Sequence, residues 1–240
     1  MRNSFTYGGR ASTYFNVWIN GLGSITGALP DVTKVKVPGR NGEIIFSNDS
    51  YNNVSIEYKC FIFRDFMNSY QRFKEFLYRQ GNRYVRLVDT YHPGYYREAR
   101  LANELKAEDI VWNNNQGFFS VVFDCKPQLF LDSGDEHIEI TTSGTTIQNP
   151  TNFPAKPILH VYGYGTLIIG DSLITIINYT SGGTDHITID CDICEAYSGI
   201  NGMNSYIQAD KFPVLEGNTS IIFTGGNISK VEVVPRWWTI

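Results

Sequence analysis

Only one stretch of the sequence, residues 65–82, carries apolar residues at helical spacing. Its large apolar side chains recur every three or four residues, at Phe66, Tyr70, Phe73, Phe76 and Leu77, which predicts an amphipathic helix. Asp65 stands at the expected N-cap, and Gly81 stands where a helix commonly ends in a left-handed residue. A chain of 240 residues with a single helix has to build its core mainly from β-strands.

The sequence on both sides of this segment alternates in the manner of half-buried β-strands. VTKVKV, EIIFS and VSIEYKCFIF precede the helix, and the last of them places Ile56, Tyr58, Cys60 and Ile62 on one face. After the helix, residues 84–105 predict two strands joined around His92-Pro93-Gly94, and GFFSVVFDCKPQLFL predicts a further strand. These elements form a predicted first domain, residues 1–131.

The second half of the sequence is a run of short predicted strands separated by turn residues. Gly170-Asp171 and Gly225-Gly226-Asn227 are typical of hairpin turns, and many short strands without a helix favour a β-sandwich over residues 157–240. Residues 132–156 are rich in Ser, Thr, Gly and Pro, so we expect a linker with one short strand at HIEIT. The predicted fold class is therefore mainly β, with one helix in the first of two domains.

Charge and composition narrow the class of function. The formal net charge is −4, so the chain lacks the basic footprint that binding to nucleic acid or to an anionic membrane requires. The first residues contain no apolar segment typical of a signal peptide, and no apolar run approaches the roughly 18 residues of a membrane helix. We therefore expect a soluble protein with no membrane insertion, whose cysteines are reduced.

Two motifs in the segment HITIDCDIC suggest chemistry. Cys191 and Cys194 form a CxxC, but strand alternation is expected to turn their sulfurs to opposite faces, which disfavours a redox or zinc site. Asp190 and Asp192 are expected to share the outer face with Cα atoms about 6.6 Å apart. This separation overlaps that of the paired carboxylates of inverting glycosidases, although two solvated acids explain it more simply.

No other pattern of catalytic or metal-binding residues stands out. The histidines His92, His137, His160 and His186 are scattered over turns and strands, without metal-ligand spacing. No nucleophile elbow is present, and no cysteine lies beside a histidine motif. We therefore expect neither catalytic activity nor a cofactor nor a metal.

The loop VPGRNGEI, residues 37–44, resembles an anion-binding loop only in composition. A phosphate-binding loop leads into a helix, whereas strands are expected on both sides of this one, and Glu43 would repel an anion. Pro-Gly and Asn-Gly are turn dipeptides, so the sequence predicts a hairpin with Arg40 at its tip.

The order of these elements resembles that of a known family. VPGRNGEI, the helix ending in FLYRQG, LVDTYHPGYYREAR and a β-only tail with KPILHVYGYG, ITIDCDICEAY, FPVLEGNTSIIF and PRWW follow one another. In this order and spacing the chain is similar, over nearly its whole length, to the distal tail proteins (Dit) of long-tailed, non-contractile, siphovirus-type bacteriophages that infect Gram-positive hosts.

The resemblance implies a structural virion protein without enzymatic activity or cofactor. Its first domain would form a homohexameric ring, single or as two stacked rings, at the distal end of the tail with DNA passing through the centre. Its second domain would be a galectin-like or carbohydrate-module-like β-sandwich. The implied partners are the tail tube protein, the tape measure protein, the tail-associated tip protein and the receptor-binding protein. The implied location is the virion tail tip, after assembly in the host cytoplasm.

Two residue sets follow from this interpretation and from its alternative. In a ring, Arg40 at the hairpin tip is predicted to contact the neighbouring subunit. The alternative function is that of a carbohydrate-binding module in host-surface attachment, with rings available to stack on sugars at Tyr162, Tyr164, Tyr197, Trp237 and Trp238. A glycoside hydrolase that uses Asp190 and Asp192 is a third hypothesis, and the sequence favours it least.

Overall fold

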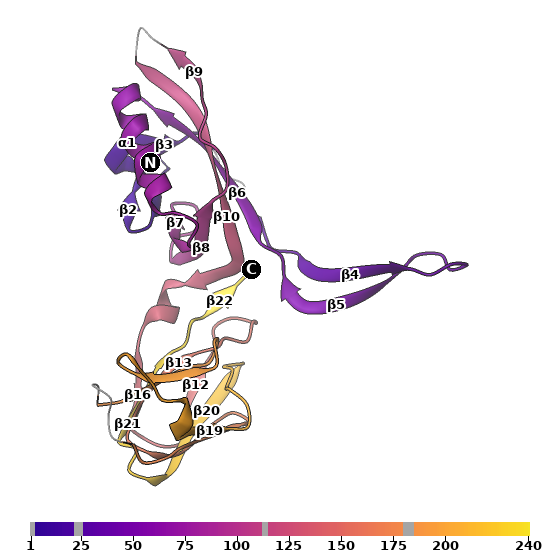
Figure 1. Ribbon diagram of the computed structural model, residues 1–240, viewed down its shortest axis with the longest axis vertical. Coiled ribbons are helices and arrows are strands. Elements are labelled where there is room, and N and C mark those ends of the chain that lie inside the picture. Colours follow the sequence, from indigo (N-terminus) through magenta and orange to yellow (C-terminus); the bar gives the residue numbers. More distant parts are fainter. Residues whose placement is uncertain (1–2, 22–25, 112–114, 180–184) are drawn as a thin grey trace. The chain divides into compact units, whose positions relative to one another are not determined.

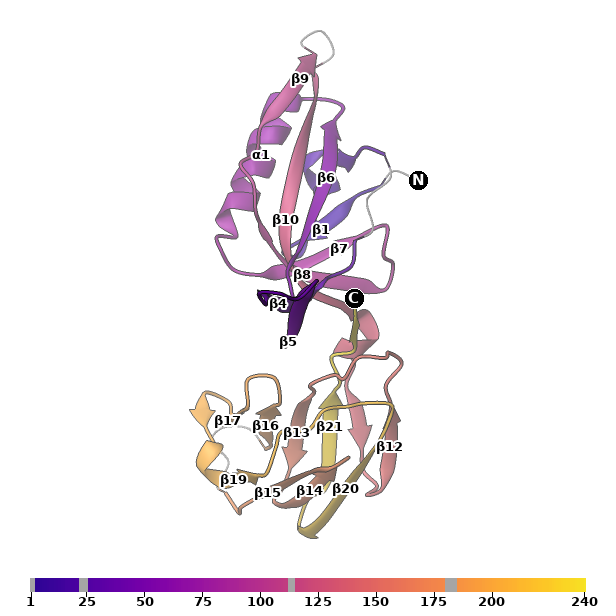
Figure 2. The ribbon, with the colours of Figure 1, turned by 90° about the vertical axis from the view of Figure 1, so that its right-hand side faces the viewer.

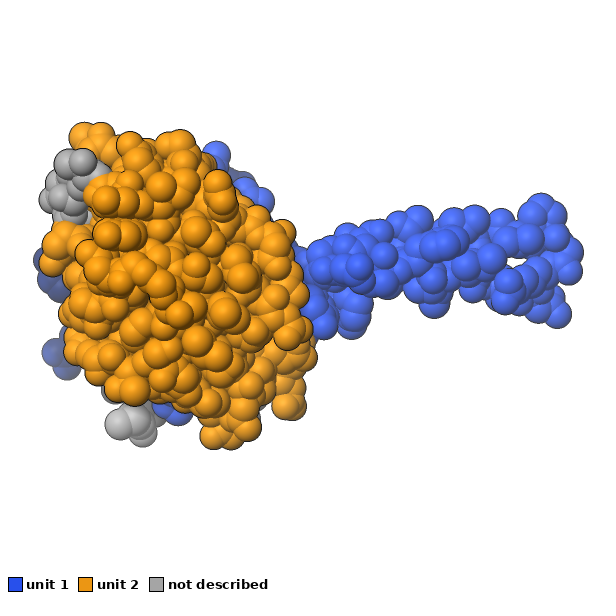
Figure 3. Space-filling view, turned by 90° about the horizontal axis from the view of Figure 1, so that it is seen from below, with its two compact units in different colours: residues 1–129, 240 blue, residues 130–239 orange. Residues whose placement is uncertain are grey.

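The computed structural model describes residues 3–21, 26–111, 115–179 and 185–240. The chain divides into two compact units, Met1–Leu129 together with Ile240, and Phe130–Thr239 (Figure 3). Strands dominate both units, and the described residues contain one α-helix, which confirms the predicted class. No helix in the described part of the chain is long and apolar enough to cross a membrane.

Unit 1 is built on an antiparallel sheet of mainly short strands (Figure 1). Its order is β2-β1-β7-β8-β10-β6-β3, with β9 also paired to β10. The strands are β1 (Phe5–Tyr7), β2 (Arg10–Ala11), β3 (Val17–Ile19), β6 (Val54–Ile62), β7 (Val85–Asp89), β8 (Tyr95–Leu101), β9 (Ala107–Val111) and β10 (Gln116–Leu131). A short 3-10 helix, Ser12–Phe15, precedes β3.

The single helix α1 (Phe66–Arg79) runs alongside β6 and β10 (Figure 2). Its buried face meets the inward side chains of β6, which include Ile56, Tyr58, Cys60 and Ile62 as expected from their alternation. Gly81 follows the helix with a φ of +65°, as predicted. Asp65 occupies the N-cap position as predicted, but the side-chain capping bond is absent, because Asp65 is left-handed and its carboxylate accepts a hydrogen bond from Asn68 instead of from the backbone.

Strands β4 (Pro30–Lys36) and β5 (Glu43–Tyr51) form a two-stranded sheet of their own within unit 1. This hairpin is drawn as a narrow ribbon in Figure 1 and as the long blue projection in Figure 3. Almost all its residues are at least partly exposed, and none belongs to the buried core. The hairpin therefore alternates like the other strands of its unit without covering any of the core.

Unit 2 is a sandwich of two sheets. The six-stranded sheet contains, in spatial order, β11 (Ile138–Ile140), β21 (Lys230–Val234), β13 (Ile158–Tyr162), β16 (Ile187–Asp190), β17 (Glu195–Ser198) and β18 (Asn201–Gly202). The five-stranded sheet contains β12 (Thr145–Gln148), β20 (Asn218–Gly226), β14 (Gly165–Ile169), β15 (Ser172–Ile176) and β19 (Ile207–Ala209). Two 3-10 turns, Asp132–Asp135 and Asn204–Tyr206, and the short strand β22 (Trp238–Thr239) complete the unit.

Both sheets turn branched aliphatic side chains toward one shared core. The hairpin turn predicted at Gly170-Asp171 joins β14 to β15. The hairpin turn predicted at Gly225-Gly226-Asn227 is wrong, because Gly225 and Gly226 belong to β20 and the chain then passes to β21 in the other sheet. Where β14 begins, Gly165 has a φ of +145°, and a Cβ there would lie 1.9 Å from the carbonyl oxygen of Gly225. Only glycine fits here, where β14 pairs with β20 at an irregularity in their register.

Residues 132–156 differ from the linker that we expected. They contain β11, where HIEIT predicted a strand, and also β12, and both strands complete sheets of unit 2. Ile140, Ile147 and Ala155 are buried in the core of that unit. The Ser- and Thr-rich composition of the segment therefore belongs to edge strands and their turns, and residues 132–156 are part of the sandwich.

Candidate functional site

One flank of the β4–β5 hairpin is apolar and exposed to solvent. Val35 lies opposite Ile44, and Thr33 lies opposite Phe46, so these side chains share a face. Phe46 is 54% exposed and Val35 is 42% exposed. A two-stranded hairpin by itself is at best marginally stable in water, and no residue of this flank belongs to the buried core of unit 1.

The opposite flank of the hairpin is mixed. Lys36 pairs across the strands with Glu43, and Lys34 pairs with Ile45, whose side chain is 62% exposed. The charged side chains of the hairpin strands that pair here thus lie on this flank, together with one exposed apolar residue.

The hairpin turn is formed by the loop whose composition resembles an anion site. Gly39 and Gly42 have φ values of +77° and +85°, and the Arg40 N–H donates to the Val37 carbonyl at 3.2 Å. Strands flank the loop on both sides, so the predicted hairpin is confirmed. Arg40 is exposed at its tip.

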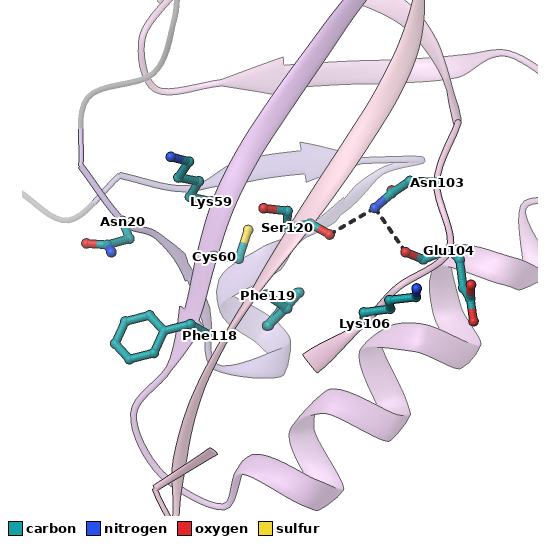
Figure 4. Close-up of a pocket in the computed structure, with 9 residues that line it drawn as sticks. All are labelled: Asn20, Lys59, Cys60, Asn103, Glu104, Lys106, Phe118, Phe119 and Ser120. Carbon is teal, nitrogen blue, oxygen red and sulfur yellow. Dashed lines mark hydrogen bonds between the residues drawn. The ribbon is translucent and has the colours of Figure 1, made fainter. Parts of the chain in front are cut away.

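A hollow of about 340 Å³ opens beside β6 and β10 in unit 1 (Figure 4). Asn103 connects two segments that line the hollow. Its side-chain nitrogen donates to the carbonyls of Ser120 and Glu104 at 3.2 Å and 3.1 Å. Cys60 is the one thiol in the lining, and burial raises its pKa. A thiol that stays protonated is a poor nucleophile, so Cys60 is not an activated nucleophile in this hollow.

A buried polar network lies next to the core of unit 1. The carboxylate of Asp89 accepts hydrogen bonds from the Tyr58 hydroxyl at 2.5 Å and from the backbone N–H groups of Tyr91 and His92, both at 2.9 Å. Arg97, 4% exposed, donates to the carbonyls of Pro127 and Thr26. These bonds connect β6 to β7 and β8 to β10, which is a structural role.

Contrary to our expectation, the CxxC motif does not continue strand β16. The strand ends at Asp190, and residues 191–194 form a turn that leaves Cys194 left-handed at a φ of +56°. Cys191 is buried and Cys194 is exposed. Burial raises the pKa of Cys191 to about 12, so it is an unreactive apolar residue.

The carboxylates of Asp190 and Asp192 are each engaged by a cation. Asp190 pairs with Arg236 at 2.5 Å and accepts the N–H of Asp192 at 3.0 Å, while Asp192 pairs with Lys156 at 3.1 Å. Burial raises the pKa of Asp190, but the bonds from Arg236 and from the Asp192 N–H lower it more, and the net change is downward. A general acid needs the opposite shift, so this pair does not suit glycoside hydrolysis.

The five rings proposed for sugar stacking have different environments. Trp237 is 4% exposed within the core, so this part of the prediction is wrong: its ring cannot stack on a sugar. Trp238 packs against Phe153 and donates to the Pro154 carbonyl at 3.0 Å. Tyr162, Tyr164 and Tyr197 are half-buried, and Tyr164 packs against the core. The sandwich therefore turns at least one of its expected stacking rings inward.

Three of the four histidines lie together, although the sequence suggested that they were scattered. His160 stacks on His137 with ring centroids 5.5 Å apart and meets His186 edge-on at 5.0 Å. Sequence spacing misses this cluster because β11, β13 and β16 come together only through the strand order of the sheet. The described residues contain no group of three side chains placed to hold a metal ion.

Comparison with known proteins places this geometry in a structural class. No family model and no curated protein matches the sequence. Among solved structures, the chain is similar to the SPP1 Dit (gp 19.1) protein, a paradigm of the hub adsorption apparatus in phages that infect Gram-positive bacteria. The TM-score is 0.66 at 15% identity, over 96% of this chain and 97% of that one. The fold is that of a Dit protein.

A second similarity agrees with this assignment. A chain of the phage p2 baseplate in its activated conformation with Sr matches with a TM-score of 0.55 at 12% identity, over 97% of both chains. The Dit fold thus extends over both units, and the resemblance seen in the order of the sequence motifs is confirmed. Sequence reasoning missed the apolar flank of the hairpin within this Dit fold, although the alternation in VTKVKV and EIIFS carried the signal.

Proposed function

We propose that this protein is a structural hub component at the distal end of a phage tail. In this role, several copies form a ring that joins the tail tube and tape measure proteins to the tip and receptor-binding proteins, and DNA passes through the ring. The protein is then part of the virion. The Dit fold over 96% of the chain supports this proposal, and so do the buried thiols of Cys60 and Cys191 and the ion-paired aspartates.

The observation that carries the proposal is the apolar flank of the β4–β5 hairpin. Val35, Ile44 and Phe46 lie on one exposed face of a two-stranded element with no core of its own. Covering this face with a second copy would remove apolar surface from water and supply the packing that an isolated hairpin lacks. Contact between a projecting element and a different surface of the next copy is heterologous, and such contacts form a ring when the rotation between copies closes.

Arg40 extends this proposal to the tip of the hairpin. Its side chain lies in an exposed turn of two glycines and an asparagine. A turn of this type needs no arginine, so we assign the guanidinium to a carboxylate or carbonyl group of the neighbouring copy. A charge reversal there would disrupt the contact and leave the fold unchanged.

Negative-stain electron microscopy and light scattering of the purified protein test the proposal. We expect rings with a central hole. Phe46→Ser and Arg40→Glu are expected to give folded monomers, with free energies of unfolding within about 0.5 kcal/mol of the parent monomer. Lys211→Glu, a charge reversal at an exposed site in unit 2, is the matched control and should leave rings intact. A strictly monomeric parent protein at high concentration would overturn the proposal.

A further inference from the structure

Three imidazole rings lie side by side on the outer face of the six-stranded sheet in unit 2. His160 is in the middle of β13, His186 directly precedes β16, and His137 directly precedes β11. The register places His160 opposite Thr188 on one side and Glu232 on the other. The cluster therefore spans β11, β21, β13 and β16, four neighbouring strands of the sheet.

The three imidazole rings are in close contact with one another. His137 and His160 are nearly parallel, with an interplanar angle of 8° at 5.5 Å, and His186 meets His160 at 82°. Tyr162 adds a fourth ring, 5.0 Å from His186. Offset-stacked and edge-on contacts of this kind are favourable between uncharged rings. The same contacts bring like charges together once two of the imidazoles are protonated.

The charged groups around the cluster leave its middle ring without a counter-charge of its own. Glu232 is held by Lys230 at 2.6 Å and lies 3.5 Å from His137, and Lys230 also pairs with Glu139. Asp185 is paired with His186 at 3.1 Å. The hydrogen-bond partner of His160 is neutral, because its Nδ1 lies 3.0 Å from the Thr188 hydroxyl.

We propose that this imidazole cluster is an acid-sensitive switch that loosens the outer face of the six-stranded sheet under mildly acidic conditions. The trigger is a second positive charge, placed on His160 between His137 and His186. The bistable element is the ring stack, which holds the start of β11 and the start of β16 against β13. The proposal concerns unit 2 alone and does not depend on ring formation.

The sign of the effect follows from where the proton binds. Burial, and then the two neighbouring imidazoles, lower the pKa of His160 below its usual value of about 6.5, and Glu232 opposes this only in part. Between the lowered pKa and about 6.5 the unfolded chain binds more protons than the folded chain. Stability contributed by His160 is thus present above this window and is lost as the pH falls through it.

Hydrogen exchange read strand by strand tests the proposal between pH 7.5 and 5.5. We expect the protection factors of β13 and β16 to fall as the pH falls. The decrease should be at most about tenfold per pH unit if the open state binds one proton more than the closed state. Strands β6 and β10 of unit 1, which contain no histidine, are the internal control and should change less. In His160→Gln, the amide can still bond to Thr188 but cannot titrate, so the pH dependence in β13 should disappear.

Two results would overturn the proposal. One is a His160→Gln variant whose β13 loses protection with pH as steeply as the parent protein. The other is an NMR titration of the parent protein in which the His160 ring protonates at or above its usual pKa, and this measurement decides the question even where the variant fails to fold. A titration below that value, together with a shifted His137 or His186 resonance at the same midpoint, supports the switch.

Discussion

The two units of this chain fill their cores with different side chains. The core of unit 1 is dominated by aromatic rings, including Phe5, Tyr7, Phe15, Tyr58, Phe66, Phe73, Phe119 and Phe123. The core of unit 2 consists mainly of Ile, Leu and Val, and Trp237 is the buried aromatic residue among the described ones. Both cores are built from buried apolar side chains, and the difference lies in the space that each has to fill.

That space is set by the elements that face each other. In unit 1 a single helix packs against one sheet, and large rings fill the space between them through stacked and edge-on pairs such as Phe5 with Tyr58 at 5.0 Å. In unit 2 two sheets lie face to face, at the separation of about 10 Å that is common in sandwiches. Branched aliphatic side chains interdigitate across such a gap without rings.

The largest expected effect comes from truncating a ring in the aromatic core. Phe123 is fully buried and contacts the rings of Tyr7 at 4.7 Å and Phe5 at 5.6 Å. Phe123→Ala should lower the free energy of unfolding by about 3–5 kcal/mol, measured by urea denaturation, because it leaves a cavity that a sheet and a helix cannot close. Phe118→Ala on the exposed side of the same strand is the control. Equal losses for the two variants would contradict the distinction between ring-filled core and surface.

A smaller loss of stability is expected at a position in unit 1 where only glycine leaves room for a neighbouring ring. A Cβ on Gly117 in β10 would lie 2.4 Å from the ring of Phe66, the first residue of α1. Gly117→Ala should cost about 1–3 kcal/mol by overpacking the contact between helix and sheet. Gly202→Ala, where a Cβ meets nothing within 4 Å, is the matched control. Unchanged stability of the Gly117 variant would show that the helix can shift on the sheet.

The smallest effect is expected in the aliphatic core. Ile189→Val removes one methylene from a fully buried position between the two sheets of unit 2, and about 0.5–1.5 kcal/mol should be lost. Ile200→Val at a fully exposed turn makes the same chemical change and should be neutral within about 0.5 kcal/mol. A loss of more than about 3 kcal/mol in the free energy of unfolding for Ile189→Val would mean that the core of the sandwich tolerates truncation no better than the aromatic core of unit 1.

The elements with local signals could be predicted from the sequence. The helix followed from the spacing of Phe66, Phe73 and Leu77, and the main hairpin turns followed from their glycines. The absence of a capping bond from Asp65 could not be predicted, because it depends on the side-chain amide of Asn68, which donates to the Asp65 carboxylate. Strand β16 is shorter than we expected. It ends at Asp190 because the Asp190 carboxylate accepts the Asp192 N–H, which forms a turn.

The sites that depend on strand order were beyond sequence reasoning. His137, His160 and His186 come from three separated strands of one sheet, and no periodicity encodes which strands become neighbours. Trp237 follows Pro235 and Arg236 in an irregular segment, where alternation gives no face. The hairpin flank is the intermediate case: its alternation was visible, but the lack of anything packed against it was not.

The hairpin also sets a length. Strand β5 has nine residues, and at about 3.3 Å per residue, with half of the turn added, the ribbon extends roughly 30 Å from its root to Arg40. A small domain has a radius of gyration of only about 13 Å. A group at the tip can therefore touch a molecule well beyond those that contact the root, so one narrow ribbon lets a single copy reach two different surfaces at once.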